Sequence, residues 1–265
     1  MIDTHCHLIP NIDDGSDSRD KSLEQIKLMA AGGVTHAFMT SHYINGYSKY
    51  TREIYDAKLE ELRSMTRDNG LNIKLLPGFE VFIHPQSIED IQKYNLTLGD
   101  SKYVLVESDL NGLTDDFYNY LYPLLRKGYR PILAHAERYV SIMQKPRDAK
   151  MLIDKDIYLQ VNSGSLLGQY GEKIRDTAWI LVRNGWVHLL ASDDHGRMPY
   201  GSLFKAREML QSELDNQIVD LLTVDFPSMV ISGKPIPHKY MYLQGKPERH
   251  SHRRKKKSLW RRIFG

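Results

Sequence analysis

The chain begins with two histidines separated by one residue, His5 and His7, in the stretch MIDTHCHLIPNIDDG. Side chains alternate between the two faces of a β-strand, so both imidazoles would point one way and Cys6 the other. Asp193 and His195 repeat this spacing in the stretch SDDHG. Each pair can offer two ligand atoms to one metal ion. A pair taken alone is equally compatible with solvated histidines or a helix cap, so the other elements of the chain must decide.

Seven β-rich runs recur along the chain with amphipathic segments between them, which is the pattern of βα units that form a parallel sheet. The expected strands span residues 1–7, 36–43, 73–82, 103–110, 131–138, 157–164 and 187–196. The expected helices span residues 20–32, 51–69, 115–127, 172–184 and 202–214. Several of these helices end at Gly or Asn, as helices commonly do. The sequence therefore predicts an α/β fold with a parallel sheet.

Residues that can bind metal ions lie at the C-terminal ends of six of the seven expected strands. Besides the two pairs, these residues are His42, Glu80, Glu107 and His135. In barrels of parallel strands the active site is built at this rim, because side chains from many strands converge there. Histidine and carboxylate ligands without a thiolate favour Mn²⁺, Fe²⁺, Mg²⁺ or Zn²⁺, and the ligands suffice for more than one ion.

Two arginines follow these candidate ligands. Arg138 comes three residues after His135, and Arg197 comes two residues after His195. A guanidinium can bind a phosphate group through two parallel hydrogen bonds, so both arginines are candidate catalytic residues, with surface solubility as the alternative. The remaining histidines are interpreted as structural or solvated: His36, His84, His188, His238, His250 and His252.

Composition excludes several classes of protein. The 265 residues are 41% hydrophobic and 26% charged, which is typical of a folded domain. The sequence shows neither a signal peptide nor an apolar run long enough to cross a membrane, so we expect a cytoplasmic protein. The single cysteine cannot form a disulfide framework. A cysteine phosphatase is also excluded, because Ile12 stands six residues after Cys6, where such an enzyme needs arginine. No phosphate-binding glycine loop is present.

The C-terminal segment has a different charge from the rest of the chain. Residues 246–265 contain nine Lys or Arg and one Glu, a net charge of +8, so the remainder carries −5 of the total +3. We expect a catalytic domain over 1–240 and a basic, flexible tail over 241–265. The tail interleaves Trp260 with arginines, which suits peripheral contact with an anionic membrane. The alternatives are a disordered solubilising extension and nucleic-acid binding.

Taken in order, the chain resembles the polymerase-and-histidinol-phosphatase (PHP) metallohydrolase superfamily over residues 1 to about 240. The matching motifs are His5-Cys6-His7, Asp13-Asp14-Gly15, His42, Glu80, Glu107, His135-Ala136-Glu137-Arg138 and Asp193-Asp194-His195. Within the superfamily, the opening motif and the H-x-E-R motif resemble the bacterial tyrosine-protein phosphatases of capsule and exopolysaccharide loci.

The resemblance implies a distorted seven-stranded (β/α) barrel, similar to a TIM barrel, that holds up to three divalent ions, with Mn²⁺ as the first candidate. The first ion would take His5, His7, Glu80 and Asp193. The second would share Glu80 and add Glu107 and His135. The third would take Asp14, His42 and His195.

The implied function is a metal-dependent phosphotyrosine-protein phosphatase that acts on a bacterial tyrosine kinase and its substrates and so regulates polysaccharide synthesis. Ions bridged by Glu80 would lower the pKa of water, so that hydroxide attacks phosphorus without a covalent intermediate. Arg138 and Arg197 would neutralise charge on the phosphoryl oxygens. The phenolate of tyrosine, whose conjugate acid has a pKa of about 10, can leave without a strong general acid, and no residue is assigned to that role. A histidinol-phosphate type of phosphomonoesterase and a nucleic-acid-binding protein or nuclease remain as alternatives.

Overall fold

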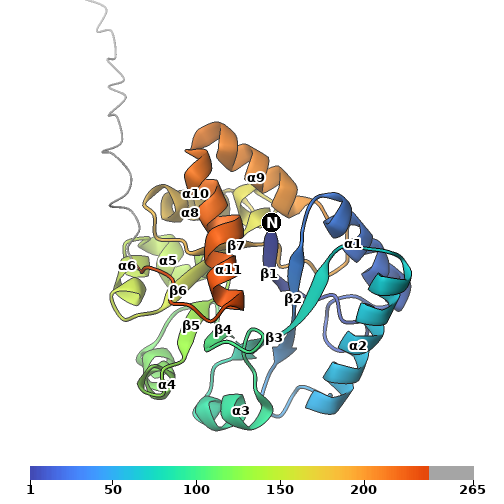
Figure 1. The fold of residues 1–265 in the computed structure, drawn as a ribbon. Coiled ribbons are helices and arrows are strands. Elements are labelled where there is room, and N and C mark those ends of the chain that lie inside the picture. The colour runs from blue at the N-terminus through green and yellow to red at the C-terminus, as the bar shows by residue number, and fades with distance from the viewer. Residues whose placement is uncertain (239–265) are drawn as a thin grey trace, which may run out of the picture.

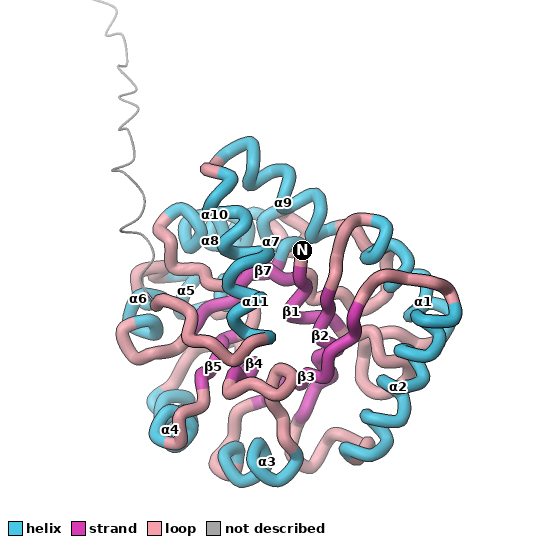
Figure 2. The backbone as a smooth tube through the Cα atoms, in the orientation of Figure 1, coloured by secondary structure: helices cyan, strands magenta, loops and turns pink. Residues whose placement is uncertain are grey.

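A seven-stranded sheet curls into a barrel whose outside is covered by helices (Figures 1 and 2). The structure is a computed structural model that describes residues 1–238, and the expected basic tail lies outside these residues. The strands are β1 (Ile2–Cys6), β2 (His36–Tyr43), β3 (Lys74–Phe82), β4 (Tyr103–Glu107), β5 (Arg130–Leu133), β6 (Tyr158–Asn162) and β7 (Leu189–Ala191). Each strand pairs in parallel with the next along the chain. The expected seven-stranded (β/α) barrel is confirmed.

The five expected helices are present within one residue of their predicted ends. They are α1 (Arg19–Ala31), α2 (Arg52–Asp68), α4 (Asp115–Arg126), α8 (Glu172–Arg183) and α9 (Ser202–Glu213). Capping fixes two of their starts, because the Ser18 hydroxyl accepts from the Lys21 amide and the Thr51 hydroxyl from the Ile54 amide. Shorter elements complete the described chain: α3 (Ser87–Tyr94), η1 (Ala136–Arg138), α5 (Val140–Gln144), α6 (Asp148–Ile153), α7 (Ser163–Leu166), α10 (Asn216–Asp220), η2 (Leu221–Asp225) and α11 (Phe226–Ile231). Among residues 1–238, no helix combines the length and apolarity needed to cross a bilayer.

Strands β5 and β7 each end five residues earlier than the sequence predicts, and this corrects how the pair Asp193 and His195 is formed. Strand β5 stops at Leu133 instead of 138, and β7 stops at Ala191 instead of 196. The chain then turns through His135 and Asp193, whose φ angles of 36° and 54° lie in the left-handed region. Such angles are costly for residues other than glycine and are concentrated at functional sites. Asp193 and His195 therefore reach the rim through a turn and not through strand alternation.

The barrel closes where the chain after β7 runs beside β1. The amide of Asp193 donates to the His5 carbonyl at 2.8 Å, and the amide of His7 donates to the Asp194 carbonyl at 2.7 Å. These two hydrogen bonds join the first strand to the segment after the last strand and so close the barrel. They also hold the His5-Cys6-His7 segment against the Asp193 turn, so that residues almost two hundred positions apart become neighbours.

The end of the barrel at which β1 begins faces the viewer in Figure 1, and α11 crosses it. The segment after α11 is tied to the same end through two tyrosines. Tyr103 donates its hydroxyl proton to the Lys234 carbonyl at 2.9 Å and accepts from the Ile236 amide at 2.8 Å. Tyr158 donates to the Ile236 carbonyl at 3.0 Å. This end is therefore occupied by the chain itself, and the opposite end carries the candidate ligands.

His188 is a buried histidine at the covered end, as expected for a structural residue. Its Nδ1 accepts from the Leu159 amide at 3.1 Å, and its ring meets that of Tyr158 edge to face. Burial lowers the pKa of His188 to about 3. In the unfolded chain this histidine has an ordinary pKa near 6.5. Between pH 6.5 and about 3, His188 is therefore protonated in the unfolded chain and neutral in the folded chain.

Acidification is consequently expected to destabilise the fold through His188. This residue alone lowers the free energy of unfolding by about 2 kcal/mol at pH 5 relative to pH 8. Urea unfolding of wild type and His188→Gln at both pH values measures the contribution, because other titrating groups affect both proteins equally. The variant should lose less stability on acidification, and an identical loss in the two proteins would contradict the prediction.

Candidate metal centre

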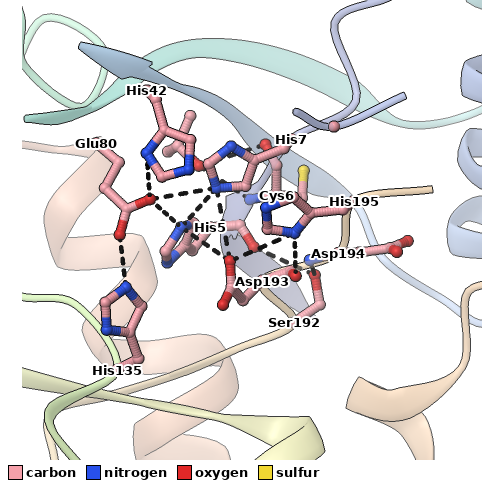
Figure 3. A network of polar contacts seen from close by, with 12 residues as sticks. His5, Cys6, His7, His42, Glu80, His135, Ser192, Asp193, Asp194 and His195 are labelled. Carbon is pink, nitrogen blue, oxygen red and sulfur yellow. Dashed lines mark hydrogen bonds and ion pairs between the residues drawn. The ribbon is translucent and has the colours of Figure 1, made fainter. Parts of the chain in front are cut away.

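Eight of the nine predicted ligands fall into three compact groups at the C-terminal rim (Figure 3). Within each group the potential ligand atoms all lie within 4.8 Å of one another. The groups are His5 with His7 and Asp193; His42 with Glu80 and Glu107; and His7 with Asp14, His42 and His195. The ninth residue, His135, contacts the second group through Glu80, with its Nε2 2.8 Å from Oε1. The barrel thus brings together residues spread from position 5 to position 195.

Glu80 lies at the centre of the cluster. Its Oε2 lies 3.2 Å from His5 Nε2, 3.3 Å from His7 Nε2 and 3.2 Å from His42 Nδ1. Its Oε1 faces His135 on the other side (Figure 3). Burial alone would raise the pKa of this carboxyl, but the charge of His5 and hydrogen bonds from three histidines outweigh burial and hold the pKa well below its usual range. Two oxygens aimed at different imidazoles suit a carboxylate that bridges two ions.

Asp14, His42 and His195 form the outer part of the cluster. Asp14 Oδ1 lies 3.4 Å from His42 Nε2 and 3.3 Å from His195 Nε2. This is the arrangement expected for the third ion. The predicted second set is less compact, because His135 Nε2 lies 3.8 Å from Glu107 Oε2, whereas His42 Nδ1 approaches Glu107 Oε1 to 3.0 Å. His42 therefore lies between two groups.

The donor set fits divalent cations. Burial opposes protonation of His42, but hydrogen bonds to Asp14 and Glu107, together with the charge of Glu80, raise the pKa of its imidazole to about 10. His5 Nε2 and His7 Nε2 lie 2.9 Å apart. Both nitrogens can therefore be directed at one cation. A site that favours positive charge so strongly, built from imidazole and carboxylate donors, matches the preferences of Mn²⁺, Fe²⁺ and Zn²⁺.

Asp13 contacts one of the predicted ligands, His7. Its Oδ2 lies 3.0 Å from His7 Nδ1 and accepts from the His42 amide, while Oδ1 accepts from the Gly15 amide. A carboxylate on the far nitrogen of a histidine fixes its tautomer and leaves the other nitrogen to a metal. Gly15 permits this approach, since a Cβ there would overlap the backbone of His7.

Strand β6, which offers no metal ligand, supplies two amide side chains that the sequence analysis did not single out. Gln160 Oε1 accepts from His5 Nδ1 at 3.0 Å and from the His135 amide at 3.2 Å. Gln160 Nε2 donates to Asn162 Oδ1 at 2.7 Å, and Asn162 Nδ2 donates to Asp193 Oδ2 at 2.6 Å. The signal was available, because positions 160 and 162 have the same spacing as His5 and His7 at the end of a strand.

The two candidate catalytic arginines lie on the same rim. The Nη1 of Arg138 lies 3.5 Å from Asp193 Oδ2, beside the ligands. The Nη2 of Arg197 lies 2.9 Å from Asp14 Oδ2, and this side chain is 68% exposed. Arg138 thus lies beside Asp193 in the buried part of the cluster. Arg197 lies beside Asp14 in its outer part. A guanidinium at either place can receive phosphoryl oxygens, and the catalytic roles of both remain a prediction.

Cys6 faces away from the cluster, as strand alternation predicts. Its thiol is fully buried and donates to the Phe38 carbonyl at 3.3 Å. Burial raises the pKa of the Cys6 thiol well above its usual value, so the sulfur is held as a neutral thiol and is a poor nucleophile.

Cys6→Ser is therefore expected to retain at least about half of the wild-type phosphatase activity, because the thiol takes no part in the chemistry. Steady-state assays with metal content measured in parallel test this expectation. Loss of activity in a variant that still binds its metals would show that the sulfur has a chemical role.

Comparison with known proteins identifies the family. The protein family described as "Capsular polysaccharide synthesis, CpsB/CapC" matches residues 1–232 of this chain. The tyrosine-protein phosphatase YwqE of Bacillus subtilis is 31% identical over 196 residues, which cover 74% of this chain and 77% of YwqE. The tyrosine-protein phosphatase CpsB of Streptococcus pneumoniae is 27% identical over 245 residues, which cover 89% of this chain and all of CpsB.

The fold gives the same result. A crystal structure from work on YwqE and CpsB, described there as metal-dependent tyrosine phosphatases, superposes with a TM-score of 0.84 at 28% identity. The match covers 89% of this chain and 96% of the other. Because the family match spans most of the chain and the rim carries the full set of expected ligands, the chain belongs to the CpsB/CapC family of capsular polysaccharide synthesis.

Proposed function

We propose that this protein is a metal-dependent phosphotyrosine-protein phosphatase, a phosphoric monoester hydrolase that regulates capsular or extracellular polysaccharide synthesis. The observation that carries the proposal is the rim cluster, in which five histidines and four carboxylates lie beside two arginines. Relatives named tyrosine-protein phosphatases support the choice of substrate class.

In this proposal the first cation is held by His5, His7, Glu80 and Asp193, the second by Glu80, Glu107 and His135, and the third by Asp14, His42 and His195. Divalent cations bound there would supply activated water and positive charge beside the phosphoryl group. Arg138, anchored to Asp193, would contact phosphoryl oxygens and offset charge that moves toward the leaving group. The departing phenolate needs no strong general acid, since its pKa is about 10.

The metal is proposed to be Mn²⁺, with up to three ions bound and with Fe²⁺, Zn²⁺ and Mg²⁺ as alternatives. Exhaustive chelation should remove activity, and titration with each ion should show Mn²⁺ or Fe²⁺ restoring most of it. Activity that survives chelation would refute metal dependence in this protein. Better restoration by Zn²⁺ or Mg²⁺ would correct the identity of the ion and leave the reaction unchanged.

The substrate class is tested by comparing three substrates on the metal-loaded protein. A phosphotyrosine peptide should be hydrolysed with a higher kcat/KM than histidinol phosphate, and single-stranded DNA should not be cleaved. Faster turnover of histidinol phosphate would favour a small-molecule phosphomonoesterase. Cleavage of DNA would favour a nuclease. The comparison therefore distinguishes the proposed function from both alternatives raised by the sequence.

The protein partner is proposed to be a bacterial tyrosine kinase and its phosphorylated substrates, met in the cytoplasm at the inner face of the membrane. The basic tail, 241–265, would provide peripheral contact with anionic lipid, and this proposal rests on its sequence alone. Deleting residues 246–265 should remove salt-sensitive binding to anionic vesicles and leave hydrolysis of a short phosphopeptide unchanged. Vesicle binding that persists after the deletion would exclude this role for the tail.

A further inference from the structure

A cavity of about 740 Å³ opens beside the metal centre. Asp193 and His195 line it on the side of the cluster, and Tyr170, Arg197 and Met198 line it elsewhere. Cavities of this size accommodate whole small ligands, so the space exceeds what a phosphate group needs. The remaining space must receive the organic part of a phosphomonoester.

Tyr170 lines this cavity close to Arg138. Its ring centroid lies 5.3 Å from Cζ of Arg138, and Arg138 in turn lies 3.5 Å from Asp193. One guanidinium therefore separates the ring from the cluster. Tyr170 is nevertheless 41% exposed, so part of its ring is open to a ligand. Tyr170 thus offers apolar surface within the cavity at short range from the place where phosphate would bind.

The loop that carries Tyr170 is fitted closely to the barrel. Tyr170 follows α7, and a Cβ at Gly164, within α7, would lie 3.1 Å from Cε2 of the Tyr170 ring and would overlap the Gln169 side chain. The glycine therefore permits the turn to pack against α7. One edge of the Tyr170 ring therefore packs against Gly164.

We propose that Tyr170 packs against the phenyl ring of phosphotyrosine and makes the site prefer aryl over alkyl phosphomonoesters. This inference rests on the proposed function and names the residue that recognises its substrate class. In an aryl phosphate the ring is attached directly to the ester oxygen, so it must lie near the phosphate. Alkyl esters place a tetrahedral carbon there, which has no planar face to pair with the Tyr170 ring. Met198, which is 74% exposed on the same cavity, adds apolar surface.

A purely structural role for Tyr170 makes a different prediction. If the ring served only to hold Arg138, its loss would weaken every phosphate ligand equally, because Arg138 would contact the phosphoryl oxygens common to all of them. Direct contact with the substrate ring affects aryl ligands alone. Ligands that share one phosphoryl group and differ only in the attached group therefore separate the two roles.

The experiment measures binding of phenylphosphonate and methylphosphonate to the full-length, metal-loaded protein by calorimetry. Tyr170→Ala should weaken phenylphosphonate about fivefold and leave methylphosphonate unchanged, because pairing of aromatic rings is worth roughly this much. Tyr170→Phe should bind both ligands as wild type does. Tyr47→Ala is the matched control, since Tyr47 is 79% exposed and does not line this cavity.

Equal weakening of both ligands, or no change in either, would overturn the role proposed for Tyr170. The proposed function fails separately, if wild type does not hydrolyse a phosphotyrosine peptide. With that peptide, Tyr170→Ala should raise KM more than it lowers kcat. A fall in kcat alone would assign Tyr170 to the support of Arg138 and contradict direct contact.

Discussion

Replacing Glu80 with glutamine is expected to reduce phosphatase turnover at least about a thousandfold while the barrel stays folded. Glu80 contacts four imidazoles, those of His5, His7, His42 and His135, within 3.3 Å. The amide of glutamine keeps the shape of the carboxylate but loses its charge. A neutral side chain cannot offset two adjacent cations, so the inner ions should be lost together.

The measurement combines turnover, metal content and circular dichroism on Glu80→Gln. Glu60→Gln is the matched control, because Glu60 lies on α2 away from the cluster, has a side chain that is 58% exposed and forms ion pairs with Arg63 and Arg67. The control should behave as wild type. If Glu80→Gln keeps more than a tenth of wild-type turnover, Glu80 does not have the central role that its contacts indicate.

The strands were predictable because their residue types carry local signals. Strand β2 has the bounds expected from the sequence, 36–43, and it pairs with β3 along its whole length. The early ends of β5 and β7 were not predictable. The left-handed turns occur at His135 and Asp193. Neither position is a glycine, so the sequence does not predict a positive φ angle there. The contacts that hold these turns join distant segments, such as Asp193 to His5.

The residue types that gather at the rim could be predicted, and so could the groups around His5 and Asp14, but the position of His42 between two groups could not. Metal-binding types at strand ends follow from the sequence, whereas the distances depend on how β7 closes against β1. His42 illustrates the difference, since it lies between Asp14 and Glu107 and approaches both. Residues that act through another side chain, such as Gln160, carry no chemical signature of their own. Tyr170 was missed for a related reason, because it lies in a turn outside every strand end.

The second large effect is expected at Gln160, which orients a ligand without being one. Gln160→Ala should weaken Mn²⁺ binding by about ten- to a hundredfold, the usual range for loss of a hydrogen bond to a ligating histidine. Its side-chain carbonyl accepts from His5 Nδ1 at 3.0 Å, so His5 presents Nε2 to the cluster. The same side chain reaches Asn162, which holds Asp193 through a 2.6 Å hydrogen bond. Removing Gln160 therefore loosens two ligands of the same inner ion.

Gln160→Glu separates orientation from simple packing, because a carboxylate retains the acceptor for His5 and the His135 amide but cannot donate to Asn162. Mn²⁺ titration should place this variant closer to wild type than Gln160→Ala. Gln217→Ala, at an exposed glutamine on α10, is the matched control and should bind Mn²⁺ normally. If the alanine variant also binds Mn²⁺ normally, then strand geometry alone orients His5, and the Gln160 amide is dispensable to the centre.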